Sequence, residues 1–213
     1  MAKDPTGPGY DPTQDVVLDA KTLRGVAHPL RLRLLGALRS EGPQTATQLA
    51  AALGESSAAT SYHLRTLASY GFVVEAPELG QGRERFWRAA HRSTWFGTPA
   101  KDAPERELGE VYLRTVARIY AENLLHWADE APDWPEEWLE GTTLSDQQLR
   151  LTPEESRRLC DELAEVVARW RDAVEARSGS DDGPRVAMTV SYQVFPRRGQ
   201  LDAVVPQDDE EQP

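Results

Sequence analysis

Residues 55–71 constrain the fold of this chain more than any other stretch, because they have the features of a helix with one buried and one exposed face. Ser56 or Ser57 can cap the start of such a helix, and Gly71 suits the left-handed position that follows its last turn. The side chains expected to face the core recur at helical spacing: Thr60, Leu64 and Leu67. The segment therefore predicts an amphipathic helix.

The opposite face of the predicted helix carries small and polar side chains: Ala58, Ser61, Tyr62 and Arg65. Small side chains permit close approach to a groove of duplex DNA, while hydroxyl and guanidinium groups can bond phosphates or base edges. For Tyr62 the sequence leaves two alternatives, contact with DNA or a partly buried ring that braces the helix. The face as a whole indicates nucleic-acid recognition.

The residues on either side of this helix predict a helix-turn-helix with a wing. Residues 45–48, Thr-Ala-Thr-Gln, form a capping box, residues 49–53 continue a short helix, and Gly54 ends it. A short helix, a glycine turn and a second helix make the helix-turn-helix arrangement. Residues 72–75 and 85–89 have the pattern of strands and are joined by a loop rich in turn-forming residues. A hairpin directly after a recognition helix is a wing.

Two more helices are predicted before this arrangement. Asp19 can cap the first, and His28-Pro29 separates it from the second, since proline disfavours helix at the residue before it. The side chains expected to face inward are Leu23, Val26, Leu30, Leu34, Leu35 and Leu38. Residues 1–15 repeat Pro and Gly without an apolar period and predict a disordered tail.

The net charge of −11 is unusual for a nucleic-acid binder until the chain is divided. Residues 19–92 carry ten Lys and Arg against six Asp and Glu, or +4, whereas residues 93–213 carry thirteen against twenty-six, or −13. Residues 1–18 supply the remaining −2. The basic surplus coincides with the predicted reading module, and an acidic remainder that repels phosphates helps to orient that module. Ordinary surface variation is the alternative explanation.

The order and spacing of five segments resemble the ArsR-type family of winged-helix transcriptional regulators. These segments are residues 23–35, 47–50, 61–64, 71–73 and 80–85. They lie within residues 15–92, under half of the chain. The resemblance implies a homodimer in which each protomer lays its recognition helix in the major groove of one half-site of a palindromic operator, with half-sites about 34 Å apart. It also implies that the wing reaches the flanking minor groove or backbone.

Transferred residue by residue, the resemblance assigns DNA contact to two groups of side chains. The recognition-helix group is Ser57, Ser61, Tyr62, His63 and Arg65, and the wing group is Arg83 and Arg85. Arginine often stands in the family where this chain has Tyr62, so fewer positive charges face the groove here. For His63 a structural hydrogen bond is the favoured interpretation. The two wing arginines flank a glycine-containing turn and suit phosphate contact, with a solvated loop as the alternative.

Many ArsR-type proteins sense metals, which requires clustered Cys, His and carboxylate ligands. Here the four histidines are scattered, and Cys160 is the single cysteine, so neither a Cys pair nor an internal disulfide can form. Cys160 stands near helix-forming leucines and is interpreted as a small buried apolar residue. No metal, cofactor or catalytic residue is therefore predicted, and the chain is not expected to be an enzyme.

Residues 93–103 contain Pro and Gly and predict a linker, after which residues 104–131 predict a long dimerisation helix with two apolar tracks. The first track is Leu108, Val111, Tyr112 and Ile119. The second, assigned to the dimer interface, is Leu113, Val116, Tyr120, Leu124 and Trp127. One track can pack on the winged helix of the same chain and the other on a second protomer. Burial of both within a monomer is the alternative.

Residues 132–206 predict a small α+β unit that is a candidate effector domain. Residues 147–151 and 186–194 alternate in the manner of strands, and a helix begins at Thr152 with a capping box and an early proline. A small-molecule effector, if one exists, would act here. Four tryptophans either line its pocket or serve as core and loop anchors: Trp127, Trp134, Trp138 and Trp170. Residues 207–213 are acidic and predict a disordered tail.

The sequence as a whole predicts an α+β, mainly α protein, in which a winged helix-turn-helix domain over residues 16–92 is followed by a dimerisation helix and the small C-terminal unit. The predicted function is a sequence-specific, dimeric repressor that binds double-stranded DNA. No apolar run reaches membrane-spanning length and no hydrophobic signal segment begins the sequence, so cytoplasm is the expected compartment, without a membrane partner. One alternative is a winged-helix scaffold whose acidic C-terminal unit binds a basic partner, and a weaker one is a ligand-storage or enzyme role for the C-terminal unit.

Overall fold

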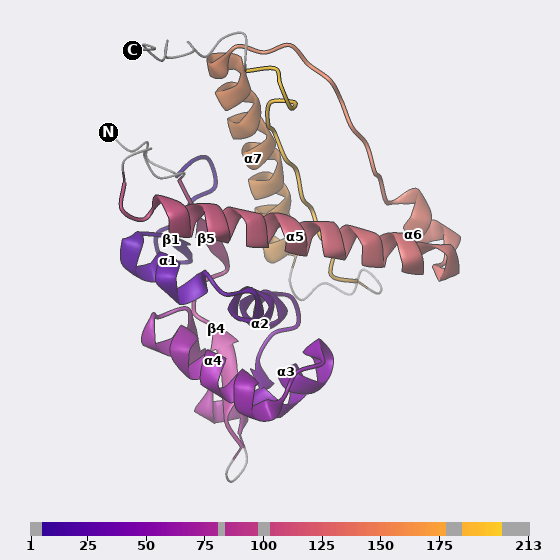
Figure 1. Ribbon diagram of the computed structural model, residues 1–213. Helices are drawn as coiled ribbons and strands as arrows, with labels where there is room; N and C mark the ends of the chain where they lie inside the picture. The colour runs from indigo at the N-terminus through magenta and orange to yellow at the C-terminus, as the bar shows by residue number, and fades with distance from the viewer. Residues whose placement is uncertain (1–5, 81–83, 98–102, 178–184, 202–213) are drawn as a thin grey trace, which may run out of the picture. The chain divides into compact units, whose positions relative to one another are not determined.

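The computed structural model describes residues 6–80, 84–97, 103–177 and 185–201. The chain divides into two units, one of residues 1–146 and one of residues 147–213. Helices dominate the described residues, and the strands among them all belong to the first unit (Figure 1). This agrees with the predicted class, a mainly helical α+β protein.

Four helices and a small sheet form the winged helix of the first unit. Its elements are α1 (Ala20–Val26), α2 (Pro29–Ser40), β2 (Gln44–Thr45), α3 (Ala46–Leu53), α4 (Ser57–Ser69), β3 (Val73–Glu75), the 3-10 turn η1 (Pro77–Leu79) and β4 (Phe86–Ala89). Asp19 and Thr45 complete capping boxes at the starts of α1 and α3. Gly54 and Gly71 adopt the left-handed conformation after α3 and α4. The predicted caps therefore set the ends of these helices.

The three strands of the winged helix form one antiparallel sheet in the order β2–β4–β3. Val73 pairs with Ala89 and Glu75 pairs with Trp87, so β3 and β4 make a hairpin directly after α4. Trp87 is 4% exposed and ties this hairpin to the core. The two predicted strands are confirmed, each starting one residue later than expected, and the hairpin is the wing.

The core lies where α1, α2, α3 and α4 meet the wing. Its fully buried side chains come from all of these elements: Leu23, Val26, Leu34, Leu35, Leu49, Leu64, Leu67, Phe72 and Val73. The inward faces predicted for the first two helices and for α4 are confirmed, including the fully buried Thr60. Apolar burial stabilises by roughly 25 cal/mol per Å², so these side chains fix the rotation of each helix. Because Leu64 and Leu67 anchor α4 from inside, its other face is left to solvent.

A second sheet joins two segments that are distant in sequence. β1 (Asp15–Val17) pairs in parallel with β5 (Ser93–Trp95). Arg92 Nε and Ser93 Oγ both donate hydrogen bonds to Asp15 Oδ1, at 2.9 and 2.8 Å. Burial raises the pKa of Asp15, but the hydrogen bonds from Arg92, a backbone amide and Ser93 outweigh burial and hold this pKa at about 2. Asp15, which the sequence placed in a tail, is therefore a structural residue.

The long helix predicted after the wing is α5 (Arg106–Glu130), and it packs on α1 and α2. Tyr112 is buried, with Leu108 and Val116 packed beside it and the ring of Phe96 meeting its ring edge to face at 4.9 Å. The sequence assigned Val116 to the dimer track. In the single chain it is half-buried and packs against the core, because its spacing of four residues from Tyr112 puts both on the same face.

The other sides of α5 are open in the single chain. Its exposed apolar side chains are Val111, Leu113, Tyr120, Leu124 and Leu125. Val111 thus leaves the core-facing track that the sequence gave it, whereas three residues of the predicted dimer track are free to meet a partner. After α5 come the 3-10 turn η2 (Ala131–Asp133) and the short helix α6 (Glu136–Glu140). The three tryptophans of this unit expected as anchors or pocket residues, Trp127, Trp134 and Trp138, are half-buried.

The second unit contains α7 (Pro153–Ala176), whose predicted start is confirmed by a capping box between Thr152 and Glu155. The strands expected at residues 147–151 and 186–194 do not form. A strand requires a neighbour for its backbone groups, and no strand partner is present in the described part of this unit. Trp170 is 64% exposed and fills no core here.

Candidate nucleic-acid interface

α4 presents to solvent the face that the sequence assigned to DNA. Ser57 and Arg65 are exposed and Ser61 is half-buried, while Leu64 and Leu67 on the inner side are fully buried. Side chains four residues apart lie on the same side of a helix, so Ser57, Ser61 and Arg65 form one line. The structure therefore brings three of the predicted contact residues together.

Geometry distinguishes the alternatives that the sequence left open at α4. Ser56 is the N-cap, because its Oγ accepts a hydrogen bond from the Ala59 N–H at 3.2 Å. The ring of Tyr62 is 63% exposed and meets the ring of His63 edge to face, with centroids 5.2 Å apart. A ring this open does not brace the helix. Tyr62 is instead accessible on the outer side of α4.

A groove of about 690 Å³ lies between α4, the wing and the start of α3. Its lining includes Thr47, Gln48, Ser61, Arg65, Arg85 and Phe86. The described lining residues carry two cations, Arg65 and Arg85, against one carboxylate, Glu84. Arg83, the second wing cation of the prediction, lies outside the described residues. The groove therefore gathers hydrogen-bond donors from three elements of the winged helix.

The first turn of α3 borders this groove, which sequence reasoning missed. Thr45 Oγ1 accepts a hydrogen bond from the Gln48 N–H at 3.3 Å, and Gln48 Oε1 accepts one from the Thr45 N–H at 2.8 Å. The capping box predicted where α3 begins but not what lies beside it. Amide groups at the start of a helix stabilise an anion, so this turn is suited to a phosphate. Thr47 and Gln48 are exposed there and join the candidate contact residues.

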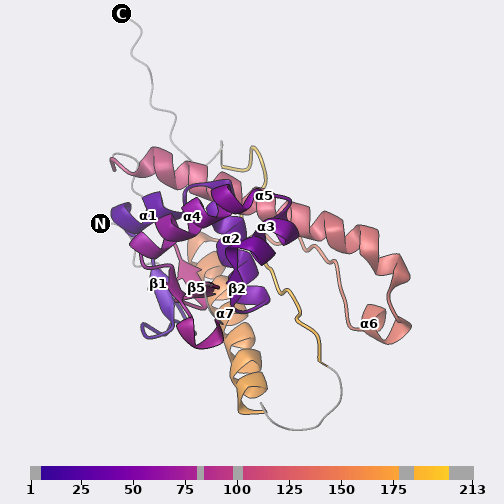
Figure 2. The ribbon, with the colours of Figure 1, turned by 90° about the horizontal axis from the view of Figure 1, so that it is seen from below.

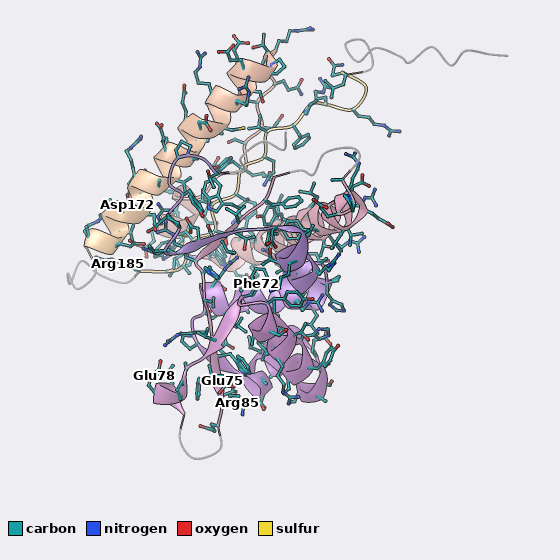
Figure 3. The ribbon with its side chains drawn as sticks, turned by 90° about the vertical axis from the view of Figure 1, so that its left-hand side faces the viewer. Phe72, Glu75, Glu78, Arg85, Asp172 and Arg185 are labelled. Carbon is teal, nitrogen blue, oxygen red and sulfur yellow. The ribbon has the colours of Figure 1, made fainter. Side chains whose placement is uncertain are left out.

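Two arginines of the wing, Arg85 and Arg88, are paired with acids of the same hairpin. Arg85 Nη1 lies 2.9 Å from Glu75 Oε1, and the two side chains are 57% and 48% exposed. Arg88 pairs with Glu78. Figure 3 shows Glu75 and Arg85 side by side on the wing, with Glu78 on the neighbouring turn. Exposed ion pairs contribute about 0–1 kcal/mol, so Arg85 can exchange its carboxylate for a phosphate at little cost.

His63 lies at the edge of α4 against His28, which begins α2. The two imidazole rings have centroids 4.4 Å apart and are tilted by 36°. His28 Nδ1 accepts a hydrogen bond from the Leu30 N–H at 3.2 Å and so caps α2. The buried Nδ1 of His63 has no hydrogen-bond partner among the described residues. The ring of His63 therefore packs against His28, and its buried Nδ1 does not make the structural hydrogen bond that the sequence favours.

Both histidines favour the neutral form in the folded chain. Burial lowers the pKa of His28, and the nearby Arg31 lowers it further. Burial also lowers the pKa of His63, followed by the effects of His28 and Arg31. Glu55 acts in the opposite direction on both pKa values without cancelling these causes. A second positive charge in this cluster is unfavourable.

The stability of the winged helix is expected to fall as the solution becomes acidic. Since the pKa values of His28 and His63 are lower in the folded chain than the ordinary value near 6.5, the unfolded chain binds more protons below that pH. The stabilisation is complete above about pH 6.5 and is lost as the pH falls through the depressed pKa values. Urea unfolding at about pH 7.5 and pH 5.5 measures this loss, which should be smaller in the double variant His28→Asn, His63→Gln.

The double variant is informative because asparagine keeps an N-cap acceptor at position 28 but does not titrate. His126→Gln is the matched control, since this histidine is exposed on α5 away from the cluster. The control should lose as much stability as the wild type. Equal losses in the wild type and the double variant would show that the histidine pair does not carry the pH dependence.

No group of three or more His, Cys, Asp or Glu side chains is placed to hold a metal ion within the described ranges. Over the same residues, no helix is both long and apolar enough to cross a membrane.

The comparisons with known proteins agree with this geometry. A family model described as a helix-turn-helix domain matches residues 26–76. The match begins at the last residue of α1 and ends directly after β3, so it includes α3, α4 and the first strand of the wing. No curated protein matches the chain. The chain therefore contains a helix-turn-helix domain, and the groove lies on its exposed side.

Proposed function

We propose that this chain is a dimeric, ArsR-type repressor that recognises a palindromic operator in double-stranded DNA. The helix-turn-helix domain at residues 26–76 indicates a DNA-binding regulator of transcription. The observation that carries the proposal is the groove between α3, α4 and the wing, because Ser61, Arg65 and Arg85 all line it. The ArsR type, the palindrome and repression are supported by the resemblance of the sequence segments.

The recognition step places α4 in the major groove. A helix with its side chains is about 10–12 Å across, and the major groove is about 12 Å wide. Leu64 and Leu67 fix α4 to the core on its inner side. Ser61 and Arg65, on the outer side, therefore enter the major groove of the DNA. Arginine can donate two hydrogen bonds to guanine, and the hydroxyls of Ser61 and Tyr62 can donate to or accept from several bases. These side chains supply the sequence preference.

The positioning step uses the DNA phosphates on either side of the major groove. The first turn of α3 offers its backbone amides, with Thr47 and Gln48 beside them. On the other side of the DNA major groove, Arg85 exchanges its ion pair with Glu75 for one with a phosphate oxygen. Ser57, at the first turn of α4, is placed for a further phosphate contact. Such contacts fix the orientation of the protein on the duplex without carrying sequence information.

The proposed dimer forms through α5. Leu113, Tyr120 and Leu124 are exposed in the single chain, and half-buried Trp127 continues the same track. Two copies related by a two-fold axis would present their α4 helices to successive half-sites about 34 Å apart, which is why the operator is expected to be palindromic. Occupying that site blocks access of the polymerase.

Substitutions at Arg85 and Ser61 are expected to weaken DNA binding in different ways. Arg85→Ala removes one phosphate contact, so affinity for every duplex should fall about 10-fold. The slope of log K against the logarithm of the salt concentration should become about one unit less steep. Ser61→Ala removes a base contact, so it should reduce the preference for the operator over related sequences. Both effects are measured by fluorescence anisotropy titrations at several salt concentrations.

Arg88→Ala is the matched control for the wing, because Arg88 is also paired with an acid of the hairpin but does not line the groove. It should change the salt slope less than Arg85→Ala. An unchanged slope in Arg85→Ala argues against wing contact, and uniform loss in Ser61→Ala argues against base reading. If the wild type does not bind duplex from its own upstream region even at low salt, the interaction-scaffold function replaces the repressor.

A further inference from the structure

Residues 186–194, beyond α7, have the composition of a strand but no strand beside them. Figures 1 and 2 show this segment extended within the second unit, where it runs along α7 in Figure 1. None of its backbone groups takes part in a hydrogen bond among the described residues. Backbone N–H and C=O groups are almost always paired when a strand packs. The segment is therefore an extended stretch of chain whose backbone groups lack a neighbour.

The side chains of this segment also lack cover. The apolar residues at alternate positions have these exposed fractions: Val186 53%, Met188 52%, Val190 69%, Tyr192 43% and Val194 36%. No described residue from 147 to 201 is buried, so α7 and this segment do not form a core of their own. A continuous apolar face of this kind marks an interaction surface. It requires an additional element that supplies both backbone partners and apolar side chains.

The sequence of the segment identifies that element, because it is symmetric about its centre. Valine stands at 186, 190 and 194, and large apolar residues stand at 188 and 192. We infer that residues 186–194 pair antiparallel with the same residues of a second copy of the chain, with Val190 on the two-fold axis. The pairing adds a second contact to the dimer proposed through α5. A two-fold axis requires this kind of self-complementary surface.

The register centred on Val190 gives every side chain a suitable neighbour. On the apolar face, Val186 lies opposite Val194 and Met188 lies opposite Tyr192 of the second copy. The other face is small or polar, and there Thr189 meets Ser191, a pair that can hydrogen-bond across strands. At the ends, Arg185 comes opposite Phe195, which is 75% exposed. An arginine beside an open aromatic ring is a favourable cation–π pair.

The helix of the same unit provides cover and charge for such a sheet. Leu159, Cys160, Leu163 and Val167 form a half-buried stripe along α7. Burial raises the pKa of Tyr192, and the thiol of Cys160 in this stripe raises that pKa further, so Tyr192 lies near Cys160. Residues 185–201 carry three Arg and no Asp or Glu, whereas α7 carries seven Asp and Glu and four Arg. Opposite charges thus favour two such strands resting on two α7 helices.

Disulfide trapping in the full-length chain tests this register. Val190→Cys, in a Cys160→Ala background, places two thiols opposite each other in the proposed pair. Directly opposed residues of an antiparallel pair have Cα atoms about 4.5–5.5 Å apart, within the range that a disulfide spans. Mild oxidation should therefore convert most of the dimer into a covalent dimer on a non-reducing gel. Val186→Cys in the same background is the matched control, because its counterpart lies roughly 27 Å away along the strands.

The outcomes separate this inference from the proposed function. A covalent dimer from Val190→Cys but not from Val186→Cys supports the antiparallel pair. Covalent dimers from both variants overturn it in favour of a parallel arrangement or random collision. Failure of both variants overturns it in favour of pairing within one chain, where residues 147–151 are the available segment. Operator binding is titrated in the same preparations. A chain that binds DNA but does not cross-link contradicts only the strand pair and leaves the proposed function standing.

Discussion

Replacing Gly25 with alanine is expected to lower the free energy of unfolding by about 1–3 kcal/mol, as overpacking of a tight core does. A Cβ atom at this buried position of α1 would lie 2.6 Å from Tyr70 Cγ and 2.9 Å from Phe72 Cε2. Tyr70 caps the end of α4 and Phe72 is 1% exposed, so neither ring can easily withdraw. Urea unfolding measures the loss. Because the strained contact lies at the end of α4, operator affinity should fall as well.

Gly36→Ala is the matched control for this substitution. Gly36 is exposed in α2, and a Cβ atom there would meet nothing within 4 Å. Alanine in an open helical position stabilises by about 0.5–1 kcal/mol, so the two glycine variants should move in opposite directions. If both variants raised the stability equally, α1 would not pack against the end of α4.

The winged helix could be predicted from sequence because its signals are local. Thr45 and Gln48 stand three residues apart and cap one helix, and Gly71 ends another. Leu64 and Leu67 show their buried side through spacing alone. In each case the residues that determine an element lie within one or two turns of each other. Local agreement of this kind also predicts that Ser61 and Arg65 face outward.

The parts that escaped prediction depend on contacts between distant residues. Asp15 and Arg92 are separated by 77 positions, and nothing in either neighbourhood indicates their ion pair. Thr47 and Gln48 were recognised as part of a helix start, but only the folded chain places that start beside the wing. The sequence favours a hydrogen bond for His63, whereas its ring packs against His28, the N-cap of another helix. Periodicity reports which side of an element is buried, not what covers it.

α5 shows the same limit in a helix with more than one apolar side. Val116 and Leu113 are both apolar and three residues apart, yet Val116 packs on the core and Leu113 is 42% exposed. The choice depends on how α5 rotates against α1 and α2, which spacing alone does not fix. The strand pattern of residues 186–194 is a related case, since alternation predicts a strand but cannot supply its neighbour.

Replacing Leu124 with aspartate is expected to convert the proposed dimer into monomers. Leu124 is 44% exposed in the single chain, so a carboxylate there leaves the monomer folded but is unfavourable against a second apolar helix. Losing the dimer removes the second half-site from each binding event. Linking two binding sites raises the affinity by about 100- to 10,000-fold, so the operator affinity of the monomer should fall by at least about 100-fold.

Sedimentation velocity of the Leu124→Asp variant measures the association state, and the anisotropy titration measures the affinity. Arg118→Asp is the control, because it places the same carboxylate on an exposed side of α5 that lies away from the predicted dimer track. This variant should remain a dimer. A strand pair formed by residues 186–194 would not hold the dimer by itself, since two isolated strands are only marginally stable. A Leu124→Asp chain that still sediments as a dimer with full operator affinity would therefore place the main interface on another surface of the chain.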